Sequence, residues 1–135
     1  MKKILPIFLT FLFFSCAEDD VDTMKLQSVY TEIEITNCQN MSFVISSQGA
    51  SESFTCSGNN FNHTTNTYQI SVIENTSFLY SIQLFPTSFN LTSCVDVVTK
   101  VYHNNSLHET RTYSFGYLPS CSHTTIGDTY SIIAD

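Results

Sequence analysis

Histidine and carboxylate side chains are the groups in this 135-residue chain that could carry acid–base chemistry. His103 and His108 lie five residues apart across a short polar segment, with Glu109 beside them. Glu32 and Glu34 would project from the same face of a strand, and paired carboxylates are what glycoside hydrolysis requires. On a strand face that is open to water, however, such acids are ordinarily just solvated. We therefore interpret the histidines as polar residues at a hairpin tip and predict no catalytic residue and no enzymatic activity.

The cysteines could bind a metal. Cys56 with His63 and Cys121 with His123 are the neighbouring Cys/His pairs, but neither forms the closely spaced cysteine motif of a zinc site. The sequence also contains no GxSxG, HExxH, P-loop or GxGxxG motif. We predict neither a metal site nor a cofactor.

The first fifteen residues, MKKILPIFLTFLFFS, read as a secretory signal. Lys2 and Lys3 give a positive start, and the apolar run from Ile4 to Phe14 is shorter than the roughly 18–20 residues that span a bilayer as a helix. We therefore expect residues 1–15 to be a signal peptide and the remainder of the chain to be exported.

The end of this leader resembles a bacterial lipobox. In Phe13-Phe14-Ser15-Cys16 a small residue precedes a cysteine, and this resemblance implies cleavage before Cys16 and diacylglycerol on its sulfur. Glu18, Asp19 and Asp20 follow directly, and they resemble the acidic export signal of surface lipoproteins of Bacteroidota-type bacteria. The resemblance implies a lipid-anchored protein of the outer membrane that faces the cell exterior. The alternative is cleavage after Ala17 and a secreted domain without lipid.

The number of cysteines fits an anchor. Five cysteines leave one unpaired in an oxidising compartment, and acylation of Cys16 leaves an even four. Each of the four flanks an expected hairpin, so the sequential pairs Cys38–Cys56 and Cys94–Cys121 require the least rearrangement. The two crossed connectivities remain open, because distant hairpins can meet when two sheets pack together.

Charge argues against nucleic acid as a partner. Without Lys2 and Lys3, three basic residues stand against twelve acidic ones, a formal net charge of −9. Such a surface repels phosphate backbones, and the three basic residues do not cluster. We predict no nucleic-acid binding.

Apolar residues recur with a period of two after the leader, which is typical of strands. Val29 to Ile35 and Met41 to Ile45 alternate with polar residues, and Ser47 to Ala50 form a plausible tight turn that sets Phe43 near Phe54.

Two further hairpins are expected. A loop at Asn75 to Ser77 would set three pairs opposite each other, Val72 with Tyr80, Ile70 with Ile82 and Tyr68 with Leu84, in a strand that ends at Pro86. A second hairpin would run from Val95 to Tyr117 with its turn at His103 to Ser106. On its outward face Asp96 would pair with Lys100. A last strand is expected over residues 129–133.

About seven to eight short strands and no convincing helix predict an all-β domain. We expect an antiparallel, immunoglobulin-like β-sandwich, with a small β-barrel as the alternative. Residues 16–25 would be the lipidated acidic tether, and residues 26–135 a single domain.

A domain of this kind without catalytic residues is expected to act as a binding module for a ligand or a partner protein at the cell surface. Tyr30 and Tyr102 lie on expected polar faces and are candidates for stacking on a glycan, although the chain has no Trp to offer a larger platform. The other expectation is a protein partner, with the protein acting as a periplasmic inhibitor or accessory subunit. The sequence does not identify the ligand.

Overall fold

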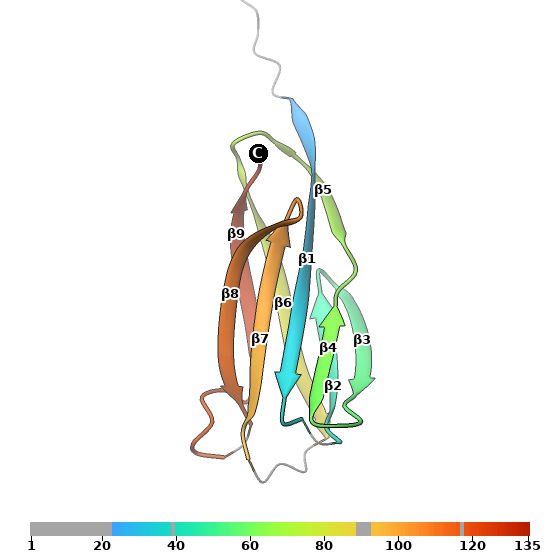
Figure 1. The fold of residues 1–135 in the computed structure, drawn as a ribbon. Helices are drawn as coiled ribbons and strands as arrows, with labels where there is room; N and C mark the ends of the chain where they lie inside the picture. The colour runs from blue at the N-terminus through green and yellow to red at the C-terminus, as the bar shows by residue number, and fades with distance from the viewer. Residues whose placement is uncertain (1–22, 39, 89–92, 117) are drawn as a thin grey trace, which may run out of the picture.

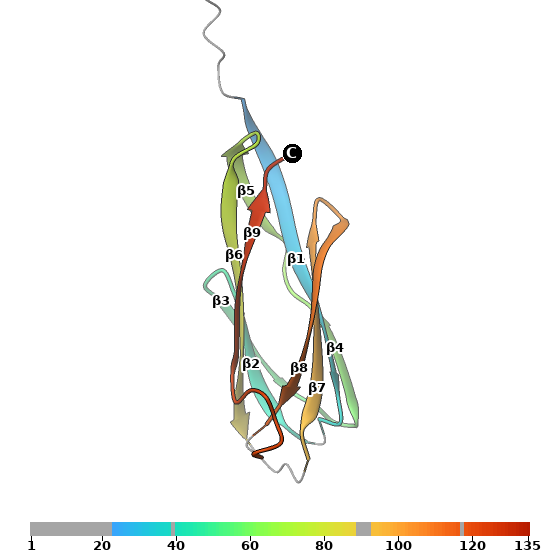
Figure 2. The same cartoon turned by 90° about the vertical axis from the view of Figure 1, so that its left-hand side faces the viewer.

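The computed structural model describes residues 23–38, 40–88, 93–116 and 118–135. These residues form nine strands and no helix, in two antiparallel sheets that pack face to face (Figures 1 and 2). The strands are β1 (Met24–Thr36), β2 (Ser42–Ser47), β3 (Ala50–Thr55), β4 (Asn60–Thr64), β5 (Tyr68–Ile73), β6 (Ser77–Ser88), β7 (Val95–His103), β8 (Ser106–Phe115) and β9 (Ile126–Ile133). The predicted all-β class is confirmed, and the described strands form two sheets rather than a closed barrel.

Sheet A has the order β4-β1-β7-β8, with β5 also paired to β1, and sheet B has the order β3-β2-β6-β9. The core between them follows the predicted alternation, because Val29, Thr31, Ile33 and Ile35 of β1 are all buried. Tyr80 and Tyr130 are buried as well, and their hydroxyls bond to Thr31 and Ser47, and to Thr99, respectively. The core is therefore apolar but contains satisfied hydroxyl groups.

Two hairpins form as predicted because their turn residues accept a left-handed backbone. Gln48 and Gly49 have φ of 48° and 83°, and Asn104 and Asn105 have φ of 46° and 64°. Two such residues in succession match the right-handed twist of the flanking strands. The resulting registers place Phe43 opposite Phe54 and Val95 opposite Phe115.

The predicted hairpin between residues 68 and 84 is wrong. β5 pairs with β1 in sheet A, whereas β6 pairs with β2 and β9 in sheet B. Tyr68, Ile70 and Val72 still pack against the same core as Tyr80 and Ile82, but from the opposite sheet. Alternation shows which face of a strand is buried. Because both sheets bury their inner faces in one core, alternation could not show whether two strands pair within one sheet or face each other across the core.

Two further expectations about strands are corrected. β6 continues through Pro86 to Ser88, with Pro86 opposite Phe43 and a register shift between Ser42 and Phe43. A shift of this kind accommodates a proline that has no N–H to donate. β4 was not expected, because Phe61 and His63 were its only markers, and it pairs with β1 in sheet A.

Both disulfides have the predicted sequential pairing. Cys38 is bonded to Cys56 and Cys94 to Cys121. Gly116 has φ of 154° and lies so close to the second bridge that an added Cβ would come within 2.8 Å of the Cys121 sulfur. Glycine is therefore required at this position.

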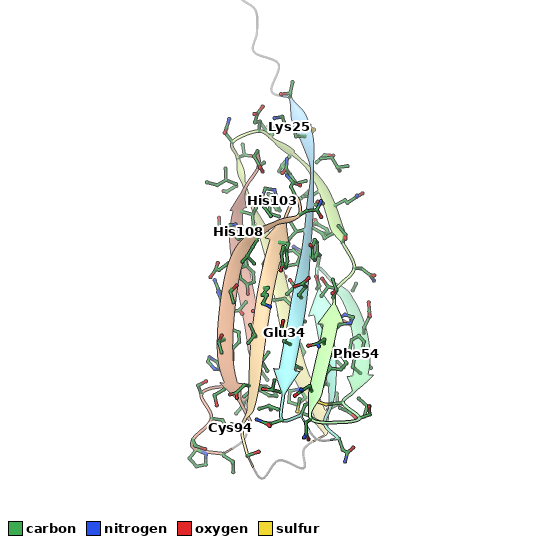
Figure 3. All side chains as sticks on the ribbon, viewed as in Figure 1. Lys25, Glu34, Phe54, Cys94, His103 and His108 are labelled. Carbon is green, nitrogen blue, oxygen red and sulfur yellow. A yellow bond between two sulfur atoms is a disulfide. The ribbon has the colours of Figure 1, made fainter. Side chains whose placement is uncertain are left out.

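The beginning of β1 and the second disulfide mark the two ends of the domain. The first residues of β1, near Lys25, lie at the end opposite Cys94 (Figure 3). β1 begins at Met24, two residues before the expected domain start. In the described ranges, no helix is long and apolar enough to cross a membrane. The signal peptide, Cys16 and the acidic residues Glu18, Asp19 and Asp20 lie outside the described residues.

Candidate binding surface

The outer face of sheet A carries the two tyrosines that the sequence suggested for stacking. Tyr30 on β1 lies opposite Tyr102 on β7, and Tyr102 lies opposite Leu107 on β8, so the three form one row across three strands. We call these three residues the aromatic row. The tyrosine rings stack with centroids 4.9 Å apart and an interplanar angle of 8°. Each ring therefore covers one face of the other, and the two do not form a coplanar platform.

Carboxylates and a lysine adjoin the aromatic row. The hydroxyl of Tyr102 donates to Glu32 at 2.9 Å, and Lys100 donates to Glu34 at 2.6 Å. These hydrogen bonds are the main cause that raises the pKa of both Tyr102 and Lys100. The expected pair between Asp96 and Lys100 is wrong. Lys100 instead pairs with Glu34, its diagonal neighbour on β1, and such diagonal cross-strand side chains lie within reach of a long lysine.

A shallow groove runs beside these acids, between β1 and β4. It holds about 260 Å³ and is lined by residues 32–34 and 62–64. Its side chains on the outer face include Glu32 and Glu34 from one strand and Asn62 and Thr64 from the other. The groove thus offers acceptors and donors but little apolar area.

Exposed apolar side chains also lie on this face, both at the β8 end of the row and toward the beginning of β1. Leu107 is 57% exposed and Leu26 is 62% exposed, and Met24 is exposed at the beginning of β1. Leu107 lies directly beside Tyr102, and an exposed apolar side chain clustered with two tyrosines suggests a contact surface.

The two histidines, His103 and His108, lie in different surroundings. His103 is buried, and its Nε2 lies 2.6 Å from Oε1 of Gln27, whereas His108 is exposed on β8. The reason is strand alternation: His103 is the last inward residue of β7 and is not at the exposed tip. The described residues contain no group of three His, Cys, Asp or Glu side chains that could hold a metal ion.

Sequence reasoning missed one charged cluster, which lies between β8 and β9. Arg111 donates to Glu109 at 2.6 Å and to Asp128 at 2.8 Å, and its guanidinium carbon lies 4.3 Å from the Tyr130 ring centroid. Tyr113 also donates to Asp128. Burial, and then this bond, raise the pKa of Tyr113, and the bond to Glu109 is the main cause that raises that of Arg111. The sequence feature that could have revealed this cluster is Asp128, an acid inside the apolar strand pattern IGDTYSII.

No protein-family model, curated protein or solved structure shows a significant match to this chain. The function must therefore be inferred from the chain's own residues.

Proposed function

We propose that this protein is an exported, lipid-anchored and non-enzymatic binding module that holds a protein partner against the outer face of sheet A. The observation that carries the proposal is the aromatic row with its surroundings. The stacked tyrosines adjoin Glu32, Glu34 and Lys100, and exposed leucines lie on the same face. An aromatic and apolar centre with a charged rim is the composition of protein interfaces.

The position of the row suits a partner near a membrane. Cys16 would carry the lipid, and Glu18, Asp19 and Asp20 would direct the protein to the outer membrane with the domain facing the exterior. Residues 16–23 can span at most about 28 Å. Tyr30 lies six residues beyond Met24 along β1, about 20 Å further. A neighbouring membrane protein is therefore within reach of this face, as an inhibitor or accessory subunit would require.

The satisfied side chains of this face support binding rather than catalysis. Glu32 accepts from Tyr102, and Glu34 is paired with Lys100, so neither carboxylate is poised as a free base. Preformed charge pairs of this kind orient a partner and set its register.

The binding proposal can be tested with two matched leucines. Leu107 lies on the outer face of sheet A, and Leu79, 66% exposed on β6, lies on that of sheet B. A photo-crosslinking residue at each position in turn, in the full protein on intact cells, should capture one protein from position 107 and none from 79. The affinity of the purified partner should then fall at least about tenfold in the Tyr30→Ala/Tyr102→Ala variant, since aromatic anchors dominate interfaces. Equal capture from both positions would contradict the proposal.

A glycan is the second candidate ligand, because the tyrosine pair is partly exposed and the adjacent groove supplies Asn62 and Thr64. Binding of the purified protein to a glycan array, lost in Tyr102→Ala, would favour it over a protein partner.

The anchor is tested separately. Labelled palmitate should enter the wild-type protein and not the Cys16→Ser variant. Equal labelling, or a mature N-terminus at Glu18, would show instead that the domain is secreted without lipid.

We also propose that the two sheets form an immunoglobulin-like sandwich, on the grounds of their antiparallel pairing and shared core. An experimental structure with a different strand order would contradict this.

A further inference from the structure

A cleft of about 130 Å³ opens between the two sheets, on the side where β3 faces β4 and β5. Ile45, Ala50 and Glu52 line it from sheet B, and His63, Asn66 and Tyr68 line it from sheet A. It lies away from the outer face that carries the aromatic row, so it is a separate site.

The cleft exists because the edge of sheet A contains a β-bulge. Glu32 lies opposite Thr64 and Val29 opposite Tyr68, so the three residues Thr65 to Thr67 face only two residues of β1. Thr65 turns inward and is held there by its N–H, which donates to the Thr31 carbonyl at 2.9 Å. Bulges at sheet edges redirect side chains and often accompany binding sites.

Glu52 lines the cleft, and in the described part of the chain only one of its two carboxylate oxygens accepts a hydrogen bond. Its Oε1 accepts from Nδ2 of Asn66 at 3.0 Å, whereas Oε2 lies 3.9 Å from Nε2 of His63, which is too long for a hydrogen bond. The Glu52 side chain is 43% exposed and that of His63 is 16% exposed. An incoming donor can therefore approach Oε2 from the solvent side.

No cation of the described chain neutralises Glu52. Burial lowers the pKa of His63 below its ordinary value, against the opposing effect of Glu52, so the imidazole is largely uncharged at neutral pH. The described Lys and Arg side chains pair elsewhere: Lys25 with Glu74, Lys100 with Glu34, and Arg111 with Glu109 and Asp128. Glu52 is thus a carboxylate in a partly enclosed site that lacks a positive partner.

We propose that this cleft binds an alkylammonium group, with Glu52 as its counter-ion and Ile45, Ala50 and Tyr68 packing its apolar stem. The volume suits a stem of about four carbons, since a cavity of roughly 150 Å³ holds a benzene molecule. The Tyr68 ring can add a cation–π contact. The acidic surface of the chain favours the approach of a cation. Such a group is found in a free amine or at the end of a lysine side chain of a protein.

The test is an NMR titration of the mature protein with n-butylammonium at pH 7, with 1-butanol as the neutral match. The ammonium should give saturable shifts of the amides of residues 45–52 and 63–68, with a Kd of about millimolar for so small a ligand. The Glu52→Gln variant should bind at least about tenfold more weakly. The Glu74→Gln variant, at the turn between β5 and β6, should bind like the wild type. The bound cation should also lower the pKa of His63, read from its ring protons.

Several outcomes would overturn the proposal. These are equal shifts with 1-butanol, no saturable shift with the amine, or undiminished binding by a folded Glu52→Gln variant. Binding of a monosaccharide in preference to the amine would assign the cleft to a neutral polyol instead. To distinguish the two sources of the group, Nα-acetyl-lysine methylamide is titrated in parallel. Binding tighter than that of butylammonium indicates a lysine side chain, and weaker binding indicates a free amine; both support the ammonium site.

Discussion

The two lateral sides of the domain close in different ways, although each brings an acid from sheet B toward sheet A. Between β8 and β9, Asp128 is bonded to Arg111 and Tyr113, and its side chain is only 12% exposed. Between β3 and β4, Glu52 faces His63, and no described cation compensates it. Charge pairs join the two sheets on the first side. On the second side aromatic rings pack between the sheets, and a cleft opens next to them.

The difference indicates which side is structural and which is available. On the β8–β9 side, all the polar groups of the cluster are used by one another, so a ligand would have to displace existing bonds. An inward-pointing charge pair of this kind also protects the free edges of two sheets from pairing with another chain. On the β3–β4 side, Phe54 and Phe61 pack around Phe43, and the acid above them keeps binding capacity. The charge pairs of the β8–β9 side are thus structural, whereas the proposed ammonium site lies on the β3–β4 side.

The largest expected effect is that of Arg111→Met. It leaves Asp128 with little exposure and no cation, and removes the contact with the Tyr130 ring, so we expect a loss of about 2 kcal/mol in the free energy of unfolding. Urea denaturation measures it. Glu52→Gln is the matched control on the other side and should change stability by less than about 0.5 kcal/mol. Equal effects of the two variants would show that the sides do not differ.

A smaller effect is expected for Phe61→Ala, which removes the ring that packs edge-on against Phe43 at 4.8 Å. Phe61 is only partly buried, so the loss should be roughly 1.5 kcal/mol, below the 3–5 kcal/mol of a fully buried phenylalanine. Leu26→Ala, at an exposed position of β1, serves as the control. Because apolar packing holds this side, the loss should not change between low and high salt. A strong salt dependence would contradict this account.

The smallest effect is the pH dependence that His63 contributes. Its folded-state pKa is held below the ordinary value of 6.5 mainly by burial. The unfolded chain therefore binds the proton more readily than the folded chain does. The stability that depends on neutral His63 is fully present above pH 6.5 and is lost as the pH falls from there through the folded-state pKa. Between pH 7.5 and 5, the wild type should lose more stability than His63→Gln. Parallel losses would show that His63 does not titrate differently on folding. Arg111 stays charged throughout this range and contributes nothing to the difference.

Prediction from sequence succeeded where local chemistry decides. Asn104 and Asn105 accept the left-handed backbone of a tight turn, and the hairpin they close has its predicted turn. Sequential disulfides followed from the same reasoning, because each pair of cysteines stands at the open end of one local segment. The candidate tyrosines were placed correctly on an outer face, but their stacking on each other depends on a cross-strand register that was not predicted.

The sequence by itself determined all the strands except β4, their buried faces and the excess of acid, because these depend on side-chain type and on a period of two. Only the tertiary structure decided that β5 and β6 face each other across the core, because strands in facing sheets and strands in one hairpin bury the same alternate residues. It likewise decided which charged side chains form ion pairs. Asp128 and Glu52 are both acids within strands, and the placement of Arg111 beside one and of a bulge beside the other separates a structural ion pair from a candidate binding site.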